Sequence, residues 1–135
     1  IFTDSCINLA KKFNCKARIM RIFPVYGPGE NKKRLYPSLL RAAKKGDDFI
    51  IKNPFEARDF TNVKFVSKIL FAAMNFNKKK FKSYQIWHVS ENKPNLIKSF
   101  AKRYWKIYNS KGKLILNKKS TVTFDHISDK SSVWR

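Results

Sequence analysis

The sequence predicts an α/β fold. Amphipathic helical patterns alternate along the chain with short apolar runs, and Pro/Gly turns separate the two kinds of segment. The first such run, at 17–23, is apolar on both faces apart from its arginines, which is typical of a strand covered by helices on each side. With 135 residues the chain is one domain or part of one, long enough to bury a core.

The chain opens with a predicted amphipathic helix over residues 2–13. Its apolar face consists of Phe2, Cys6, Leu9, Ala10 and Phe13. Lysines close the segment, where the negative pole of the helix dipole favours cations. A turn at 14–16 leads into the strand at 17–23, so the first two elements form half of an alternating α/β unit.

The strand at 17–23 is expected to stop at Pro24, where the backbone turns. Pro37 then suits the first turn of a second helix, because the N–H that it lacks has no helical partner there. Gly46 is expected to end this helix. A short strand at 49–51 follows.

The remainder of the chain repeats the alternation of helix and strand. The predicted elements are a turn at 53–54, a helix over 63–74 capped by Thr61 or Asn62, a solvated basic loop at 78–80, a strand at 84–89, a turn at 92–94, a helix over 96–107 and a short strand at 113–116. Residues 121–135 show little periodicity, so no element is predicted there.

The chain has a large excess of positive charge. Its 30 Lys and Arg against 9 Asp and Glu give a net charge of +21, which favours anionic partners such as nucleic acid, acidic lipid or phosphorylated small molecules. The lysines are spread along the whole chain, a distribution that fits a solvated surface equally well. Tyr104 and Trp105 among lysines keep a nucleic-acid-binding function open, although both fall on helix positions that a core would claim.

Several other kinds of protein and site are not indicated. Cys6 and Cys15 lack the spacing of zinc ligands and are expected to be reduced thiols in a cytoplasmic protein, and no metal site is predicted. No apolar run approaches the ~20 residues that cross a bilayer. His88 has no Ser, Cys or carboxylate spaced to work with it, so we expect a packed or surface histidine. The chain starts at Ile1 in mid-pattern, so we expect sequence to precede it.

Four phrases occur in a specific order along the first 108 residues. They are Arg21-Ile22-Phe23 leading into Val25-Tyr26-Gly27-Pro28-Gly29-Glu30, then Arg34-Leu35-Tyr36-Pro37, then Arg58-Asp59-Phe60 followed by Val63, and then Ala72-Ala73. In this order they resemble the C-terminal half of the extended short-chain dehydrogenase/reductase family, specifically the NAD-dependent epimerases and dehydratases of nucleotide sugars. The tail matches loosely at Asp129. The resemblance implies the C-terminal part of a Rossmann-like doubly wound sheet plus the small substrate-binding α/β lobe, with residues 1–135 as a partial domain.

The resemblance also implies a nucleotide-sugar pocket. A diphosphate calls for fixed cations, and an arginine can fork onto phosphate oxygens. The family places an arginine at the position of Arg58 on the nucleotide diphosphate, Arg34 is a second cation nearby, and Lys52 is a further candidate. The structural alternative for Arg58 is an ion pair with Asp59 or Glu56.

The cofactor side of the family site is only partly present. The resemblance places Phe23 beside the nicotinamide of NAD or NADP, and Pro24 where the family often has an Asn that binds the sugar nucleotide. Pro24 has no side-chain donor, so the sugar contact must be made otherwise. Phe65 stands where the family usually has an Asp, which alters the local helix start.

No catalytic residue is expected in this chain. The Gly-rich phosphate turn and the Tyr-x-x-x-Lys pair of the family do not occur, and the Lys would fall just upstream of Ile1. The sequence therefore predicts a fragment of an NAD(P)-dependent nucleotide-sugar epimerase or dehydratase, with a homodimer interface on the helix of residues 1–13. The alternatives are a non-catalytic nucleotide-binding module or degenerate relic, and then a basic nucleic-acid binder.

Overall fold

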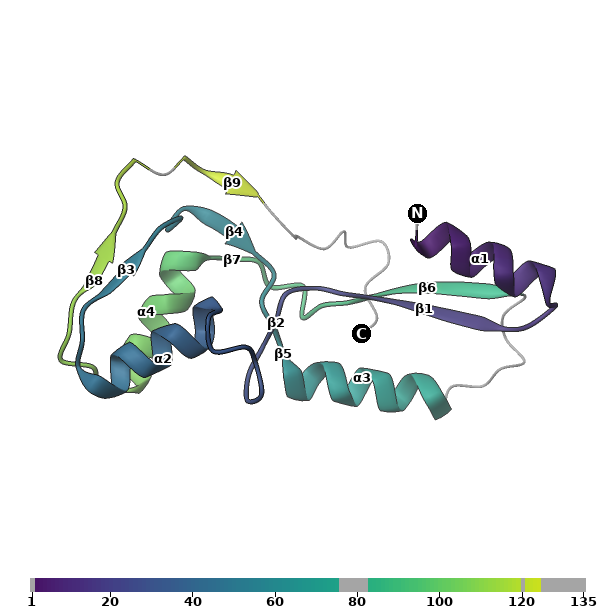
Figure 1. Ribbon diagram of the computed structural model, residues 1–135, viewed down its shortest axis with the longest axis horizontal. Helices are drawn as coiled ribbons and strands as arrows, with labels where there is room; N and C mark the ends of the chain where they lie inside the picture. The colour runs from purple at the N-terminus through teal and green to yellow at the C-terminus, as the bar shows by residue number, and fades with distance from the viewer. Residues whose placement is uncertain (1, 76–82, 120, 125–135) are drawn as a thin grey trace.

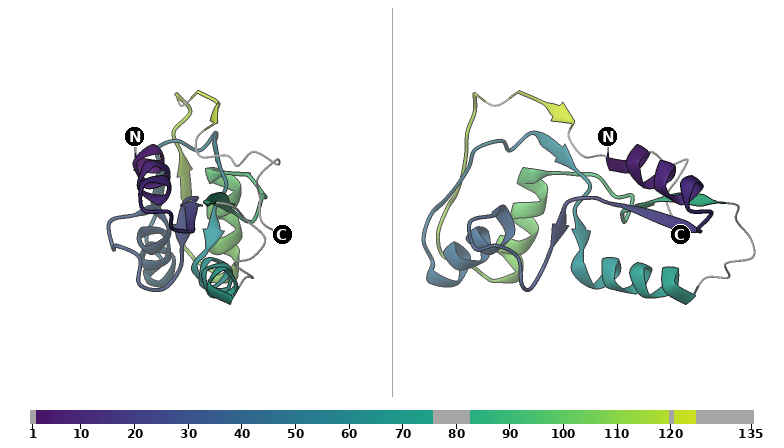
Figure 2. Two further views of the ribbon diagram at one scale, coloured as in Figure 1. Left: turned by 90° about the vertical axis from the view of Figure 1, so that its right-hand side faces the viewer. Right: turned by 45° about the vertical axis from the view of Figure 1, so that its right-hand side comes forward.

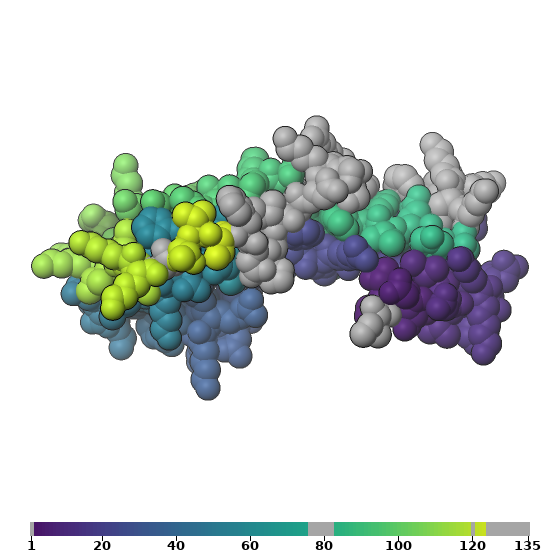
Figure 3. All heavy atoms as spheres, turned by 90° about the horizontal axis from the view of Figure 1, so that it is seen from above, coloured from purple at the N-terminus to yellow at the C-terminus, as the bar shows by residue number. Residues whose placement is uncertain are grey.

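The computed structural model describes residues 2–75, 83–119 and 121–124. Helices and mostly parallel strands form an elongated molecule with two lobes (Figure 1). Figure 3 shows the same division in a space-filling view, with the purple atoms of the N-terminal helix at one end and the yellow-green atoms of the last strands at the other. The predicted α/β class is confirmed.

The first lobe is a narrow sheet between two helices. Its strands, β1 (Ala17–Ile22) and β6 (Tyr84–Val89), pair in parallel along their whole length. Helices α1 (Phe2–Lys12) and α3 (Val63–Asn75) lie on opposite faces of these strands (Figures 1 and 2). On its other edge β1 has no strand partner among the described residues. The core against α3 consists of Val66, Ile69 and Val89, with Met20, Val25 and Phe65 packed on it.

The predicted helix at 2–13 is present as α1, but most of its apolar face is uncovered. Phe2, Leu9 and Phe13 are 79%, 54% and 66% exposed, and Ala10 is the buried member of the face. A sheet of two strands is too narrow to cover the whole stripe. The sequence pattern showed which face is apolar and could not show what covers it.

The second lobe packs two helices against short strands. α2 (Leu35–Lys45) contacts α4 (Ile97–Ile107), and β3 (Phe49–Ile51) pairs in parallel with β8 (Leu114–Leu116). β4 (Glu56–Arg58) lies between β7 (Asn95–Leu96), which is antiparallel to it, and β9 (Thr123–Phe124), which is parallel. The core of this lobe consists of Leu39, Ile51, Ile97 and Ala101.

Aromatic rings fill the side of this lobe that faces the first one. Phe60 stacks on Phe100 with ring centroids 4.1 Å apart, and Tyr26, Tyr36 and Tyr104 meet edge to face. Burial, and then a hydrogen bond with Tyr26, raises the pKa of Tyr104. Tyr104 therefore belongs to the packed interior, as its helical position predicted.

Two very short strands join the lobes. β2 (Val25–Tyr26) pairs in parallel with β5 (Thr61–Asn62) beside the start of α3. β1 ends at Ile22, so the predicted end of this strand at Pro24 is confirmed, whereas the short strand β2 that follows Pro24 was not predicted. Asn62 caps α3 as expected, because its Oδ1 accepts the N–H of Lys64 at 2.9 Å.

Other short elements also differ from the prediction. Arg58 closes a strand instead of lying at a loop end, Leu96 belongs to β7 before the helix, and β9 lies in the tail where no element was predicted. Strands of two or three residues are too short to show a period. The two that were predicted, β3 and β8, consist of apolar residues only. The predicted loop at 78–80 and Asp129 lie outside the described residues. Within the described part, no helix has both the length and the apolarity to span a bilayer.

Candidate functional site

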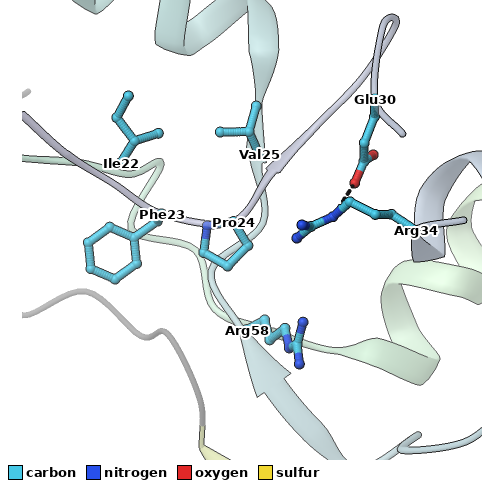
Figure 4. A pocket seen from close by; sticks show the side chains of 7 residues that line it. All are labelled: Ile22, Phe23, Pro24, Val25, Glu30, Arg34 and Arg58. Carbon is cyan, nitrogen blue, oxygen red and sulfur yellow. Dashed lines mark ion pairs between the residues drawn. The ribbon is translucent and has the colours of Figure 1, made fainter. Parts of the chain in front are cut away.

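A cavity of about 510 Å³ opens at the carboxyl end of β1, where the two lobes meet (Figure 4). It is lined by Ile22, Phe23, Pro24, Val25, Glu30, Arg34 and Arg58. A smaller cavity of about 230 Å³ shares several of these residues and extends over Tyr26, Leu35, Tyr36 and Phe60. The end of a parallel strand is the usual place for a ligand in an α/β sheet.

The loop after β2 carries Glu30 into this cavity. Gly27 allows the loop to form, because its φ is +146° and an added Cβ would lie 2.5 Å from Cγ1 of Val63. The N–H of Glu30 donates to the carbonyl of Gly27 at 3.3 Å. These contacts fix the loop at the point where α3 begins.

Arg34 stands at the start of α2 and points toward the cavity (Figure 4). Its Nε lies 3.1 Å from Oε1 of Glu30, with the arginine side chain 60% exposed and the glutamate side chain 14% exposed. Burial raises the pKa of the Glu30 carboxyl, and the charge of Arg34 opposes this shift in part. The pair therefore joins an exposed cation to a carboxylate that is poorly solvated.

Arg58 enters the same cavity from β4 and is held by Glu56. The Nε of Arg58 donates to Oε1 of Glu56, and Asn53 Nδ2 donates to Oε2 at 3.3 Å. Of the two ion pairs considered as the structural alternative for Arg58, the one with Glu56 is present. Arg58 also lines both cavities. Its ion pair with Glu56 is therefore compatible with a role in ligand binding.

Asp59 is fully buried, and the sequence suggested only Arg58 as its possible partner. Its Oδ2 accepts a hydrogen bond from Ser90 Oγ, and its Oδ1 accepts the N–H of Lys93 at 3.2 Å. The N–H of Asn92 donates to Ser90 Oγ at 2.8 Å. These bonds tie the loop after β6 to the end of β4, and no spacing in the sequence indicates them.

One edge of the cavity is apolar. Phe23 and Pro24 line the cavity, and the Phe23 ring lies 5.8 Å from that of His88. The carbonyl of Pro24 accepts the N–H of Thr61 at 2.9 Å, so this backbone group is engaged within the fold. Such an edge can pack against a flat ring, and its two side chains offer no donor to a pyrophosphate.

Lys52 does not join the other candidate residues. It is exposed at the end of β3 and is not among the residues that line either cavity around Arg58. Its carbonyl accepts Asn117 Nδ2 at 3.1 Å. The structure thus brings together Phe23, Pro24, Arg34 and Arg58 and leaves Lys52 apart.

A second hollow, of about 610 Å³, runs along the outer side of α2. Its basic members are Lys32, Arg41, Lys44 and Lys45. Arg41 Nη2 donates to the carbonyl of Lys32 at 3.3 Å. Anion binding at this surface has to be distinguished from binding at Arg58. Within residues 2–75, 83–119 and 121–124, no group of three or more His, Cys, Asp or Glu side chains could hold a metal ion.

Comparisons with known proteins agree with the fold of this chain. The chain is similar to a UDP-glucose 4-epimerase from Thermotoga maritima with UDP-glucose, at 16% identity and a TM-score of 0.72 over 91% of this chain and 40% of that one. It is also similar to a UDP-N-acetylglucosamine 4-epimerase from Methanobrevibacter ruminantium in complex with UDP-N-acetylmuramic acid, at 18% identity and a TM-score of 0.71 over 94% and 43%. RMD from Pseudomonas aeruginosa complexed with NADPH gives 13% identity and a TM-score of 0.73 over 93% and 42%.

The chain spans less than half the length of these structures. The similarity confirms the Rossmann-like fold class that the sequence predicted. A search of curated proteins found no match. A family model described as the NAD dependent epimerase/dehydratase family matches residues 1–86. The chain belongs to the NAD dependent epimerase/dehydratase family.

Proposed function

We propose that this chain forms the sugar-nucleotide-binding part of an NAD(P)-dependent nucleotide-sugar epimerase or dehydratase. One observation carries the proposal: Arg34 from the start of α2 and Arg58 from β4 line one cavity beside Phe23 and Pro24. Two arginines at the end of a parallel strand suit a diphosphate. Residues 1–135 would then be the substrate-binding part of the domain.

In this proposal each described residue has a separate task. Arg58 and Arg34 hold the diphosphate of the ligand, and Phe23 and Pro24 form the apolar edge against which a nicotinamide ring would lie. NAD(P), when bound, supplies hydride transfer at a sugar carbon that bears a hydroxyl. The proton donor of the family's Tyr-x-x-x-Lys pair does not occur in this sequence, so we expect the 135-residue chain to bind without turnover. Production of NADH by the purified chain would contradict this.

The binding test is a calorimetric titration with UDP at constant ionic strength. Wild type is expected to saturate, and Arg58→Ala is expected to lose at least about tenfold in affinity, because a charge-assisted fork onto phosphate disappears. Arg41→Ala is the matched control, since it removes one arginine from the outer hollow of α2 and leaves the cavity intact. Equal losses for both variants would show binding by overall positive charge alone, and would overturn the proposal.

A non-catalytic nucleotide-binding module is the second candidate, because the same cavity could hold a nucleotide without chemistry. The intact mass of the native gene product separates the two. A mass of twice 15.9 kDa or more would favour the enzyme, and a mass of 15.9 kDa would favour the module.

We also propose that the protein is cytoplasmic and self-associates through α1. The exposed apolar side chains of Phe2, Leu9 and Phe13 support the second point, because a stripe of this kind is stabilised when another apolar surface covers it. A second copy of the helix would present the same stripe.

A further inference from the structure

Glu56 is buried, carries a charge and lines neither of the cavities around Arg58. We infer that Glu56 is a positioning residue, whose carboxylate fixes the plane of the Arg58 guanidinium and so directs this side chain to an anionic ligand in the cavity. The inference rests on the proposed function, because it assigns how the diphosphate-binding arginine is held. The sequence analysis considered Glu56 only as an ion-pair partner of Arg58 that would take the place of a ligand, and gave it no role in binding.

The geometry around Glu56 holds both oxygens of its carboxylate. Oε1 accepts from Arg58 Nε, and Oε2 accepts from Asn53 Nδ2 at 3.3 Å. Glu56 and Arg58 are two residues apart on β4, so their side chains leave the strand on the same face. The glutamate side chain is 8% exposed and that of Arg58 is 30% exposed, so a buried anchor holds a side chain that reaches the surface of the cavity.

A guanidinium is planar, and fixing one of its nitrogens therefore fixes the direction of the whole group. Without this contact, a larger part of the ordering of Arg58 would fall to the ligand. Ordering a long side chain on binding reduces affinity by about 2- to 10-fold. Glu56 removes that cost in advance, since the contact already exists in the chain without ligand.

The charge of Glu56 has the opposite effect on an anion. A carboxylate beside the arginine lowers the positive potential that a phosphate meets, so removing the charge alone should tighten binding. The orienting effect and the charge effect can be separated, because glutamine keeps the acceptor oxygen for Nε and loses the charge. Alanine loses both.

The experiment is calorimetric titration of UDP into wild type, Glu56→Gln and Glu56→Ala at the same pH and salt. Glu56→Gln is expected to bind UDP at least as tightly as wild type. Glu56→Ala, which has the same net charge as Glu56→Gln, is expected to bind about 3- to 10-fold more weakly than Glu56→Gln. Thermal unfolding of both variants shows whether the comparison is made on folded protein.

Equal affinities for Glu56→Gln and Glu56→Ala, with UDP bound by wild type, would overturn the positioning role and leave the proposed function standing. If Glu56→Ala does not fold, Asn53→Ala replaces it, because this change frees one oxygen of Glu56 and leaves its charge in place. Weaker UDP binding by Asn53→Ala supports the inference, and unchanged binding overturns it. Wild type that binds no UDP would contradict the proposed function and this inference together.

Discussion

Oε1 of Glu30 lies 3.1 Å from Nε of Arg34, on the rim of the cavity that Arg58 enters from the other side. Each arginine of this cavity is therefore paired with a glutamate before any ligand arrives. A diphosphate bound as proposed would have to compete with Glu30 for Arg34. The pair would then weaken the hold of the cavity on an anion.

Replacing Glu30 with glutamine should tighten UDP binding. The variant loses the carboxylate that competes for Arg34, and the gain expected for a partly exposed ion pair is about two- to fivefold in affinity. Calorimetric titration measures it. Weaker binding by Glu30→Gln would mean that Glu30 holds Arg34 in a productive position instead of competing with the ligand.

The same pair predicts a pH dependence. Burial raises the pKa of Glu30 above 4.5, and a phosphate nearby would raise it further, so UDP binding is coupled to proton uptake by this carboxyl. As the pH falls through the pKa of Glu30, wild type should approach the affinity of Glu30→Gln. The ratio of the two dissociation constants, measured from pH 7 downward, cancels the ionisation of UDP itself. A ratio that stays constant would contradict the coupling.

The hydrogen bonds of the buried Asp59 carboxylate are expected to stabilise the fold. Asp59→Ala leaves the buried Ser90 hydroxyl and the partly buried N–H of Lys93 without this acceptor, at a cost of about 1–3 kcal/mol in the free energy of unfolding. Ser90→Ala removes the donor and should cost about 1 kcal/mol. Urea unfolding measures both. Equal, small effects would show that the loop after β6 is held by other contacts.

Gly27 should tolerate no side chain. Gly27→Ala places a Cβ 2.5 Å from Cγ1 of Val63 at a φ of +146°, so both a clash and backbone strain result. We expect a loss of about 1–3 kcal/mol in the free energy of unfolding. Gly29→Ala is the matched control, because its φ of +89° is also strained but no atom lies within 4 Å of an added Cβ. If both variants lose the same stability, the contact with Val63 has no part in the effect.

Self-association through α1 can be tested with a charge on its exposed stripe. Phe13→Glu should reduce the fraction of dimer in sedimentation velocity, because the carboxylate would be desolvated at an apolar interface. Phe71→Glu on α3 is the control, since Phe71 is 64% exposed and lies on a different helix. A wild-type chain that remains monomeric at all concentrations would contradict the proposed interface.

The longer elements of this fold could be predicted from the sequence for clear physical reasons. α2 has an apolar face of two turns and ends at Gly46, whose φ of +76° is left-handed. β1 and β6 each have six residues, which is enough for their apolar character to show. The presence of Arg34 and Arg58 at one cavity was also expected. That expectation came from the family resemblance, since the spacing of the two residues in the sequence does not indicate it.

The remaining features depend on contacts between distant segments. Glu30 had no assigned role in the cavity, since only the folded chain shows that it meets Arg34. Glu56 was named as a possible ion-pair partner of Arg58, without a role in ligand binding. The partners of Asp59, Ser90 and Lys93, come more than 30 residues later in the sequence, after α3. Lys52 was a candidate for the nucleotide-sugar pocket, but its position after β3 puts it away from the cavity.

The outer edge of β1 has a consequence for how this chain behaves at high concentration. An open strand edge offers backbone donors and acceptors that can template pairing with another molecule, which is a route to aggregation. Arg21 is exposed on that strand and opposes such pairing between copies by repulsion, whereas Arg18 lies over the Trp87 ring and donates to the carbonyl of Ala73. Because repulsion between exposed charges is screened by salt, the protection that Arg21 gives is expected to weaken as ionic strength rises. The exposed charge on β1 thus disfavours edge-to-edge pairing, in addition to any attraction that the chain exerts on phosphate.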